Sequence, residues 1–246
     1  MKKTYLARGR QSAIPLMLSL LPLTFAHAAS GLDDMVSCLL EPSRQVAVAS
    51  PVSGVVSRIY YDRGDVIKVG DKLFELESGV EQANLVQARA RLKLVEGKYA
   101  RNQALVREDI LSEQEAHELE AEYELARAAR DEAQAVLARR TVLSPIQGVV
   151  VKRLLSPGEQ TAGSPVLRLA TINPLHADIT LRASAYGKLK PGMSLRVSAG
   201  EGLPVLNGKV RQVDPVIDAA SGTYSISVEL ANPGSRVPAG LNCTLR

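Results

Sequence analysis

Residues 50–56, with the sequence SPVSGVV, recur as SPIQGVV at residues 144–150. The likeness continues downstream, because another glycine follows ten residues after the first in both copies, as Gly64 and Gly158. A third glycine and a hydrophobic run then follow in both copies, one residue earlier in the second copy. Glycines at fixed offsets mark tight turns between short strands. Two copies of one four-strand unit therefore predict a quasi-symmetric pair of β halves; chance similarity of two β meanders is the weaker interpretation.

The segment between the two copies has a different composition. Residues 80–140 contain no proline, one glycine and thirteen alanines, together with many Glu, Arg and Gln, which are strong helix formers. Hydrophobic residues recur there at three-and-four spacing in two stretches, which predicts two helices joined by a turn near residues 108–111. The predicted seam residues are Leu85, Ala88, Leu92, Val95, Tyr99 and Val106, then Ala116, Leu119, Tyr123, Ala126, Ala133 and Leu137.

Each predicted helix opens with the pattern of a capping box, Ser78-x-x-Glu81 and Ser112-x-x-Glu115. In this motif the hydroxyl and the carboxylate each accept a hydrogen bond from an amide that the helix leaves unpaired. Both seams are narrow and rich in alanine, so we expect an antiparallel hairpin that buries one seam and leaves its other faces in water. A helical bundle domain is the alternative.

The C-terminal region, from Ile172 to Arg246, has short alternating runs separated by turns. The turns contain Lys190-Pro191-Gly192 and Asn232-Pro233-Gly234. Such spacing is typical of a small antiparallel barrel. The helical block is therefore an insertion into a β protein.

These segments, in this order, resemble a known family. Residues 51–76 and 145–169 look like the two halves of a lipoyl or biotinyl domain, with Gly-Asp-x-Ile-x-x-Gly-x-x-Leu at 64–73. A lipoyl half, a helical hairpin, a second lipoyl half and a β-barrel resemble periplasmic adaptor (membrane fusion) proteins of the HlyD/AcrA type over about residues 36–246. The turn sequences Asp214-Pro215-Val216-Ile217-Asp218, Ser221-Gly222-Thr223, Asn232-Pro233 and Pro238-x-Gly240 are similar to those of the adaptor barrel.

The resemblance implies a mainly β fold with an inserted α-helical hairpin, in which a split lipoyl/biotinyl-like domain and a small antiparallel β-barrel form an elongated molecule. The expected divisions are a signal peptide at 1–28, a lipoyl-like domain at 46–78 and 141–171, a hairpin at 79–140 and a barrel at 36–45 and 172–246. Longer adaptors add a membrane-proximal domain, for which we expect no residues in this chain.

The N-terminus has the composition of an export signal. A basic head precedes the apolar run 13–25, and Ala26-His27-Ala28 follows as an A-x-A cleavage signal. Thirteen residues are too few to span a hydrocarbon core, which needs about 20; an uncleaved anchor is the alternative. We therefore expect a periplasmic protein. Of the 30 basic residues, four lie in this leader, so the remainder has 26 basic and 26 acidic side chains. This balance argues against nucleic acid or an anionic membrane surface as the main partner, since either would favour a net basic field.

The sequence offers little support for catalysis, a metal or a cofactor. His117 and His176 are the histidines outside the leader, and neither lies within motif distance of a cysteine or another histidine. A swinging-arm carrier of biotin or lipoate is a second hypothesis that the lipoyl resemblance raises. It would require a lysine at the turn between the two halves. Lys68 and Lys72 lie before or inside predicted strands instead, and the hairpin occupies that turn. We expect no enzyme activity and no cofactor.

Arg101, Leu105 and Ser112 show the spacing Arg-x3-Leu-x6-Ser around the predicted helical turn. This spacing resembles the tip motif of adaptors that meet an outer-membrane channel. It implies that Leu105 fills an apolar gap, that Arg101 donates to carboxylates or carbonyls and that Ser112 bonds the partner backbone. The alternatives are a solvated face for Arg101, hairpin core for Leu105 and a simple N-cap for Ser112.

Cys38 and Cys243 are the only cysteines. In the family that the chain resembles, the N-terminal segment runs back beside the barrel, which implies that the two cysteines could pair and join the ends of the domain. Two unrelated buried thiols are the alternative. Export would bring the chain into the periplasm, where disulfides are permitted.

The function implied by the resemblance is that of a periplasmic adaptor in a tripartite efflux or secretion system. The implied partners are an inner-membrane transporter, a TolC-like outer-membrane channel and further copies of the chain, six in the family. The short hairpin favours a transporter of the RND class over ABC or major-facilitator transporters by analogy only. A periplasmic binding or regulatory module that keeps the adaptor fold is a further alternative.

Overall fold

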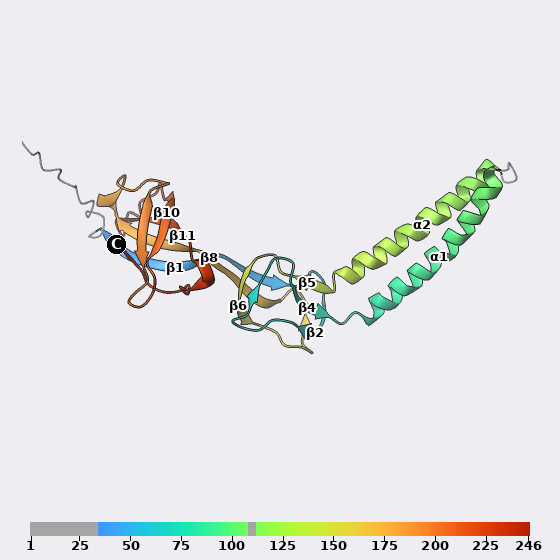
Figure 1. Cartoon of the computed structure of the whole chain (residues 1–246), viewed down its shortest axis with the longest axis horizontal. Coiled ribbons are helices and arrows are strands. Elements are labelled where there is room, and N and C mark those ends of the chain that lie inside the picture. The colour runs from blue at the N-terminus through green and yellow to red at the C-terminus, as the bar shows by residue number, and fades with distance from the viewer. Residues whose placement is uncertain (1–33, 108–111) are drawn as a thin grey trace, which may run out of the picture.

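The structure, a computed structural model, describes residues 34–107 and 112–246, so the expected signal peptide lies outside the described residues. Three parts follow one another along an elongated, curved molecule, as Figure 1 shows: a barrel at one end, a sandwich in the middle and a helical hairpin at the other end. The predicted fold class is confirmed. Neither helix in the described part of the chain is long and apolar enough to cross a membrane.

The bounds of the elements fix this arrangement. The hairpin consists of α1 (Gly79–Arg107) and α2 (Glu113–Ala138). The strands before it are β1 (Met35–Ala49), β2 (Gly54–Ile59), β3 (Val66–Ile67) and β4 (Lys72–Leu76). Those after it are β5 (Thr141–Leu143), β6 (Gly148–Arg153), β7 (Gln160–Thr161), β8 (Pro165–Arg182), β9 (Ser194–Ser198), β10 (Leu206–Val213), β11 (Thr223–Leu230) and β12 (Thr244–Leu245). Two 3₁₀ turns, η1 (Ala183–Ala185) and η2 (Pro233–Ser235), complete the description.

The two sequence copies interlock through their turn glycines. The amide of Gly64 in the first copy donates to the carbonyl of Val150 in the second, at 2.9 Å. Reciprocally, the amide of Gly158 donates to the carbonyl of Val56, at 2.8 Å. Both glycines have positive φ, +95° and +91°, which favours glycine because it lacks a Cβ atom. Each half therefore supplies a backbone partner for the turn of the other half.

The reunited halves enclose a single core. The four-stranded sheet β5-β4-β2-β7 faces strands β3, β6 and the first part of β8, and both copies contribute buried aliphatic side chains. Phe74 is the largest of these side chains and is completely buried. The core residues are Val48, Val56, Ile67, Leu73, Phe74, Leu76, Val142, Ile146, Val150, Val166, Leu167 and Leu169. The split domain is thus one packing unit although the hairpin separates its halves in sequence.

Strands β1 and β8 join the sandwich to the barrel without a linker. They pair antiparallel from Met35↔Leu181 in the barrel to Ala49↔Pro165 in the sandwich. The expected divisions near residues 45 and 171 therefore lie inside continuous strands. Since backbone hydrogen bonds cross this boundary, a two-stranded ribbon connects the two β parts, which are not separate domains joined by a linker.

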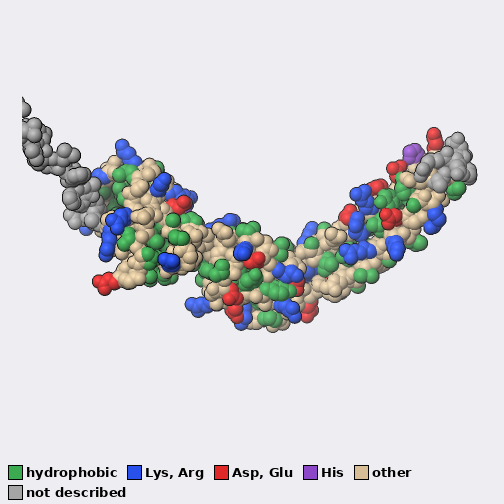
Figure 2. All heavy atoms as spheres, viewed as in Figure 1, with side chains coloured by type: hydrophobic (Ala, Val, Ile, Leu, Met, Phe, Trp, Pro, Cys, Tyr) green, Lys and Arg blue, Asp and Glu red, His purple; other side chains and the backbone are tan. Residues whose placement is uncertain are grey.

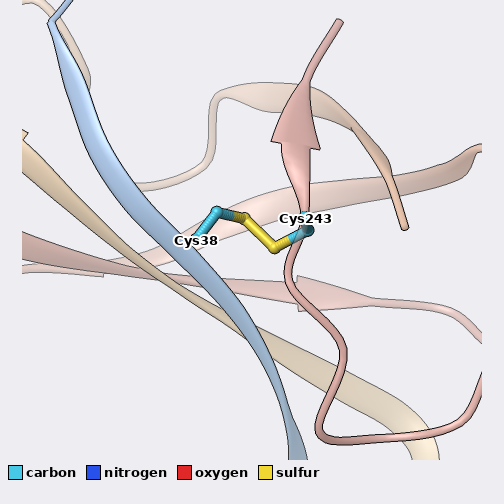
Figure 3. The surroundings of a disulfide bond; sticks show 2 residues. All are labelled: Cys38 and Cys243. Atoms are coloured by element: carbon cyan, nitrogen blue, oxygen red, sulfur yellow. A yellow bond between two sulfur atoms is a disulfide. The ribbon is translucent and has the colours of Figure 1, made fainter. Parts of the chain in front are cut away.

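The barrel is closed by the last residues of the described chain. Its strands follow the order β12-β9-β10-β11-β8, with β1 on the free side of β8. Leu40 of β1 donates its amide to the carbonyl of Leu241 at 2.8 Å and accepts from the amide of Gly240. In the same region the Sγ atoms of Cys38 and Cys243 are bonded, with their Cα atoms 4.9 Å apart (Figure 3). The bond joins two segments that are 205 residues apart.

The hairpin buries the predicted seam. Leu85, Val95 and Ala126 are buried between the helices, and the rings of Tyr99 and Tyr123 stack with their centroids 5.1 Å apart. Outside the seam, the carboxylate of Glu122 on α2 bridges Arg91 and Lys98 on α1, both at 2.9 Å. The hydrogen bond from Lys98 is the main reason why the pKa of Glu122 lies below its usual value. The two helices are therefore held by a thin apolar contact and by ion pairs across it.

Candidate partner-binding site at the hairpin tip

The predicted tip residues lie at the far end of the hairpin, away from both β parts (Figure 1). Arg101 is exposed near the end of α1, and Leu105 keeps 37% of its surface accessible one turn further on. An apolar side chain with this exposure is available for contact with a partner. Residues 108–111 of the predicted turn lie outside the described residues. The structure thus places Arg101 and Leu105 where an end-on partner could reach them.

Ser112 performs the structural role that its alternative interpretation gave it. Its hydroxyl accepts from the amide of Glu115 at 3.3 Å and donates to the carboxylate of Glu115 at 2.7 Å, and that carboxylate accepts from the amide of Ser112 at 3.0 Å. The predicted capping box at α2 is confirmed. These bonds, first of all the one from the hydroxyl, lower the pKa of Glu115. A partner that bonds Ser112 would have to compete with the cap.

A groove beside the tip adds residues that sequence reasoning missed. It lies between the two helices, encloses about 390 Å³ and is lined by Tyr99, Asn102, Gln103, Ala116, His117, Leu119 and Glu120. Asn102 takes the seam position between Tyr99 and Val106 in the three-and-four series. A polar residue at a seam position was the signal that the apolar seam opens here, and it could have been recognised in the sequence.

The base of the hairpin is fixed by Arg140, which follows α2. Its guanidinium donates to the carbonyl of Ser53 at 2.9 Å and to the carboxylate of Glu81 in the first turn of α1 at 2.5 Å. Glu81 therefore does not serve the predicted capping box at Ser78, whose hydroxyl accepts from Gln82 instead. The backbone amide of Glu81, and then Arg140, lower the pKa of the Glu81 carboxyl. Arg140 thus ties both helices to the sandwich.

We expect Arg140→Met to loosen the hairpin base without unfolding the sandwich. The substitution keeps an apolar stem but removes the bonds to Ser53 and Glu81, so hydrogen exchange of the amides from Gln82 onward at the start of α1 should accelerate by roughly tenfold. Because the folded pKa of Glu81 is depressed, its contribution is present above the unfolded pKa and is lost as pH falls through the folded pKa. Acidification should therefore loosen the hairpin base in the wild type and have a smaller effect in the variant, which keeps only the backbone amide of Glu81 as a partner of the carboxylate.

Arg139→Met is the matched control for this prediction, because Arg139 is the neighbouring residue and is exposed. Its exchange pattern should remain that of the wild type. Equal protection of α1 in the Arg140 variant and the wild type would show that the clamp does not hold the hairpin.

Neither of the lysines considered for a carrier function lies at the junction between the two halves of the sandwich. Lys72 is on β4 and its ammonium pairs with Glu75 at 2.7 Å. The backbone amide of Lys68 donates to Asp71 in the preceding β3–β4 turn. Strand β4 leads through Glu77 and Ser78 directly into α1. Within residues 34–107 and 112–246, the structure contains no group of three His, Cys, Asp or Glu side chains that could hold a metal ion.

Comparison with known families agrees with this architecture. The family described as "CzcB-like, barrel-sandwich hybrid domain" matches residues 44–170, which is the sandwich with its inserted hairpin. The chain belongs to this family. The resemblance to periplasmic adaptor (membrane fusion) proteins is therefore confirmed.

Relatives with assigned names belong to efflux systems. The chain is 23% identical over 216 residues to "Multidrug resistance protein MexA" of Pseudomonas aeruginosa, covering 80% of this chain and 56% of MexA. It is 25% identical over 232 residues to "Membrane fusion protein MtrC" of Neisseria gonorrhoeae, covering 82% of this chain and 56% of MtrC. The chain thus spans about half the length of the curated relatives that it matches.

Solved structures show the same fold. A MacA–MexA chimeric protein that contains the Pseudomonas aeruginosa MexA alpha-hairpin domain superposes with a TM-score of 0.73 at 22% identity, over 85% of this chain and 76% of the chimera. The membrane fusion protein Spr0693 from Streptococcus pneumoniae R6 superposes with a TM-score of 0.65 at 18% identity, over 86% of this chain and 97% of Spr0693. At these identities the likeness concerns the fold.

Proposed function

We propose that this chain is a periplasmic adaptor subunit that bridges an inner-membrane transporter, of the RND class, to a TolC-like outer-membrane channel. The observation that carries the proposal is the projecting antiparallel hairpin, which leaves the reunited sandwich at one end and presents Arg101 and Leu105 near its far end. The names of the relatives, a multidrug resistance protein and a membrane fusion protein, support the same role. In this role the chain is structural, and it acts in the periplasm.

Further copies of the chain are expected to pack side by side. Helix α1 has six basic and two acidic residues, whereas α2 has two basic and eight acidic residues. Both helices also expose aliphatic side chains away from the shared seam, Val86 and Leu94 on α1 and Leu125 on α2. Figure 2 shows charged side chains of both signs along the hairpin, among hydrophobic ones, on the visible face. The α1 flank of one copy therefore complements the α2 flank of the next, which favours a closed head-to-tail ring.

The tip is tested by charge substitution at its two exposed residues. We expect Leu105→Asp or Arg101→Asp to abolish complementation of transport in a strain that lacks the adaptor, at normal protein levels. An aspartate at position 105 would place an unpaired charge in the partner contact, and one at 101 would reverse the charge offered to the partner. Leu105→Met and Arg101→Lys are the controls and should retain transport.

Wild-type transport by both aspartate variants would show that Arg101 and Leu105 at the hairpin tip make no contact that transport requires. Site-specific crosslinking from position 105 separates the bridge from a binding or regulatory module with the same fold. Only the bridge should trap an outer-membrane channel protein.

A further inference from the structure

The hairpin is closely packed along only part of its length. Between its base and the stacked rings of Tyr99 and Tyr123, the side chains of Leu85, Val95 and Ala126 are buried. Beyond the stack, towards the tip, none of the side chains that the structure describes is buried. The groove of about 390 Å³ lies at this point and is lined by residues of both helices. The seam is therefore closed near the base and open near the tip.

Asn102 accounts for the open seam. It takes the seam position that follows Tyr99, and Ala116 and Leu119 of α2 line the same groove. The side chain of Asn102 has no hydrogen-bond partner within residues 34–107 and 112–246. A seam that closed over this amide would take it out of water without a replacement for its hydrogen bonds, which is unfavourable. A polar residue at a seam position lowers the stability of a helix pair but fixes its geometry. Asparagine at position 102 therefore favours an open groove over a more stable, closed seam.

The lining of the groove combines an apolar floor with one negative charge. Tyr99, Ala116 and Leu119 are half-buried, whereas Glu120 lies at the exposed rim. None of the lining residues is lysine or arginine. The side chain of Glu120 is 59% exposed, and its one ion contact in the described part of the chain is long, 4.0 Å from Oε2 to Nδ1 of His117. An apolar floor with a carboxylate at its rim suits a side chain that has an aliphatic stem and a cationic head.

The surroundings of the groove are also acidic. Residues 113–124 of α2 include six glutamates and neither lysine nor arginine, and Figure 2 shows acidic side chains near the far end of the hairpin on the visible face. Glu115 is engaged in the helix cap and Glu122 in the ion pairs with α1. Arg101 does not line the groove; its guanidinium lies back along α1, where Nη1 would be 3.5 Å from a Cβ atom on Gly97. The groove therefore offers a negative field to a partner.

We propose that this groove binds a basic side chain, lysine or arginine, from the periplasmic end of the outer-membrane channel, an inference that rests on the proposed function. The stem of that side chain lies against Ala116 and Leu119, and its head reaches the carboxylate of Glu120 and the side-chain oxygen of Asn102. The contact adds recognition of charge to the contact at Leu105.

The position of the groove favours the channel over a second copy of the chain as the source of this side chain. The groove opens between the two helices of one hairpin, near the exposed Leu105 at the far end of the molecule. Copies that pack side by side meet at the outer flanks of the helices, where Val86, Leu94 and Leu125 are exposed. An end-on partner therefore reaches the groove more directly than a neighbouring hairpin does.

The test is the affinity of the exported chain for the purified TolC-like channel of the same bacterium, measured by surface plasmon resonance. Glu120→Gln should weaken binding by at least about tenfold, because it removes the charge and keeps the shape of the side chain. Glu118→Gln is the matched control, since Glu118 is exposed two residues away on the same helix and does not line the groove. It should bind the channel like the wild type.

Asn102→Leu separates binding from stability. Leucine fills the open seam, so the amides of the residues that line the groove should exchange more slowly than in the wild type. Affinity for the channel should nevertheless fall by at least about tenfold, because the closed seam leaves no room for the partner's side chain. Loss of structure cannot produce slower exchange together with weaker binding.

Wild-type affinity of Glu120→Gln overturns the inference, as does wild-type affinity of Asn102→Leu with slowed exchange. If Glu120→Gln binds the channel normally but self-associates less in analytical ultracentrifugation, the groove is a contact between copies instead. A wild type that does not bind the channel overturns both this inference and the proposed bridge. Normal binding by both groove variants, together with loss of binding by Leu105→Asp, overturns the groove alone.

Discussion

Gly148→Ala is expected to destabilise the protein by about 3 kcal/mol or more, the upper range for overpacking in a closely packed site. A Cβ atom at this position would lie 2.0 Å from the carbonyl oxygen of Ala170 and 3.1 Å from the Cα of Thr171. Both atoms belong to the backbone of β8, which also pairs with β1 and continues into the barrel. The backbone of β8 therefore cannot move away from the added methyl group without disturbing the pairing of β1 and β8 that joins the two β parts.

Gly54→Ala is the matched control, because Gly54 occupies the same place in the first copy of the repeat. There a Cβ atom would meet the end of the Arg140 side chain at 2.7 Å and Leu76 Cδ1 at 3.1 Å. Since only side chains would have to shift, although one of them is the Arg140 clamp, we expect a smaller loss of about 1–2 kcal/mol. Urea unfolding followed by circular dichroism measures both. Equal losses would show that the close approach of β6 and β8 at Gly148 is not what requires glycine.

Replacing both cysteines, Cys38→Ser with Cys243→Ser, is expected to lower the free energy of unfolding by about 2–5 kcal/mol, the usual cost of losing a native disulfide. The bond closes a loop with a sequence separation of 205 residues and joins β1 to the segment that closes the barrel. Without it the unfolded chain gains freedom, while backbone hydrogen bonds of Leu40 and of residue 38 still hold the closing segment against β1.

Two measurements check the disulfide prediction. A reductant should lower the thermal midpoint of the wild type towards that of the double variant and leave the double variant unchanged. A free-thiol assay on the denatured, unreduced periplasmic protein should detect no reactive thiol. Two reactive thiols per chain would refute the pairing.

Features that depend on nearby residues were predictable. The three-and-four spacing located the helical seam, and Leu85, Val95 and Ala126 are buried in it. The Ser112–Glu115 cap needs only four consecutive residues and is present. The same pattern at Ser78 predicted a capping box with Glu81, and this prediction was wrong. The carboxylate of Glu81 binds Arg140 instead, which is 59 residues away in the sequence. A local motif fails where a distant charge offers a stronger partner.

The candidate site was predictable only in part, for the same reason. The spacing of Arg101, Leu105 and Ser112 indicated the end of the hairpin, and Arg101 and Leu105 are exposed there. The groove at Asn102 depends on how residues of α1 and α2 face one another, which no spacing within one helix determines.

The sequence by itself determined the repeated turns, the inserted helices and the order of the parts, because glycine placement and hydrophobic period act over a few residues. Only the tertiary structure decided which glycine is irreplaceable. Gly54 and Gly148 stand in the same motif, yet one faces movable side chains and the other faces the backbone of β8. The physical reason is that close packing depends on atoms from strands far away in the chain, whose approach is fixed only when the two halves interlock.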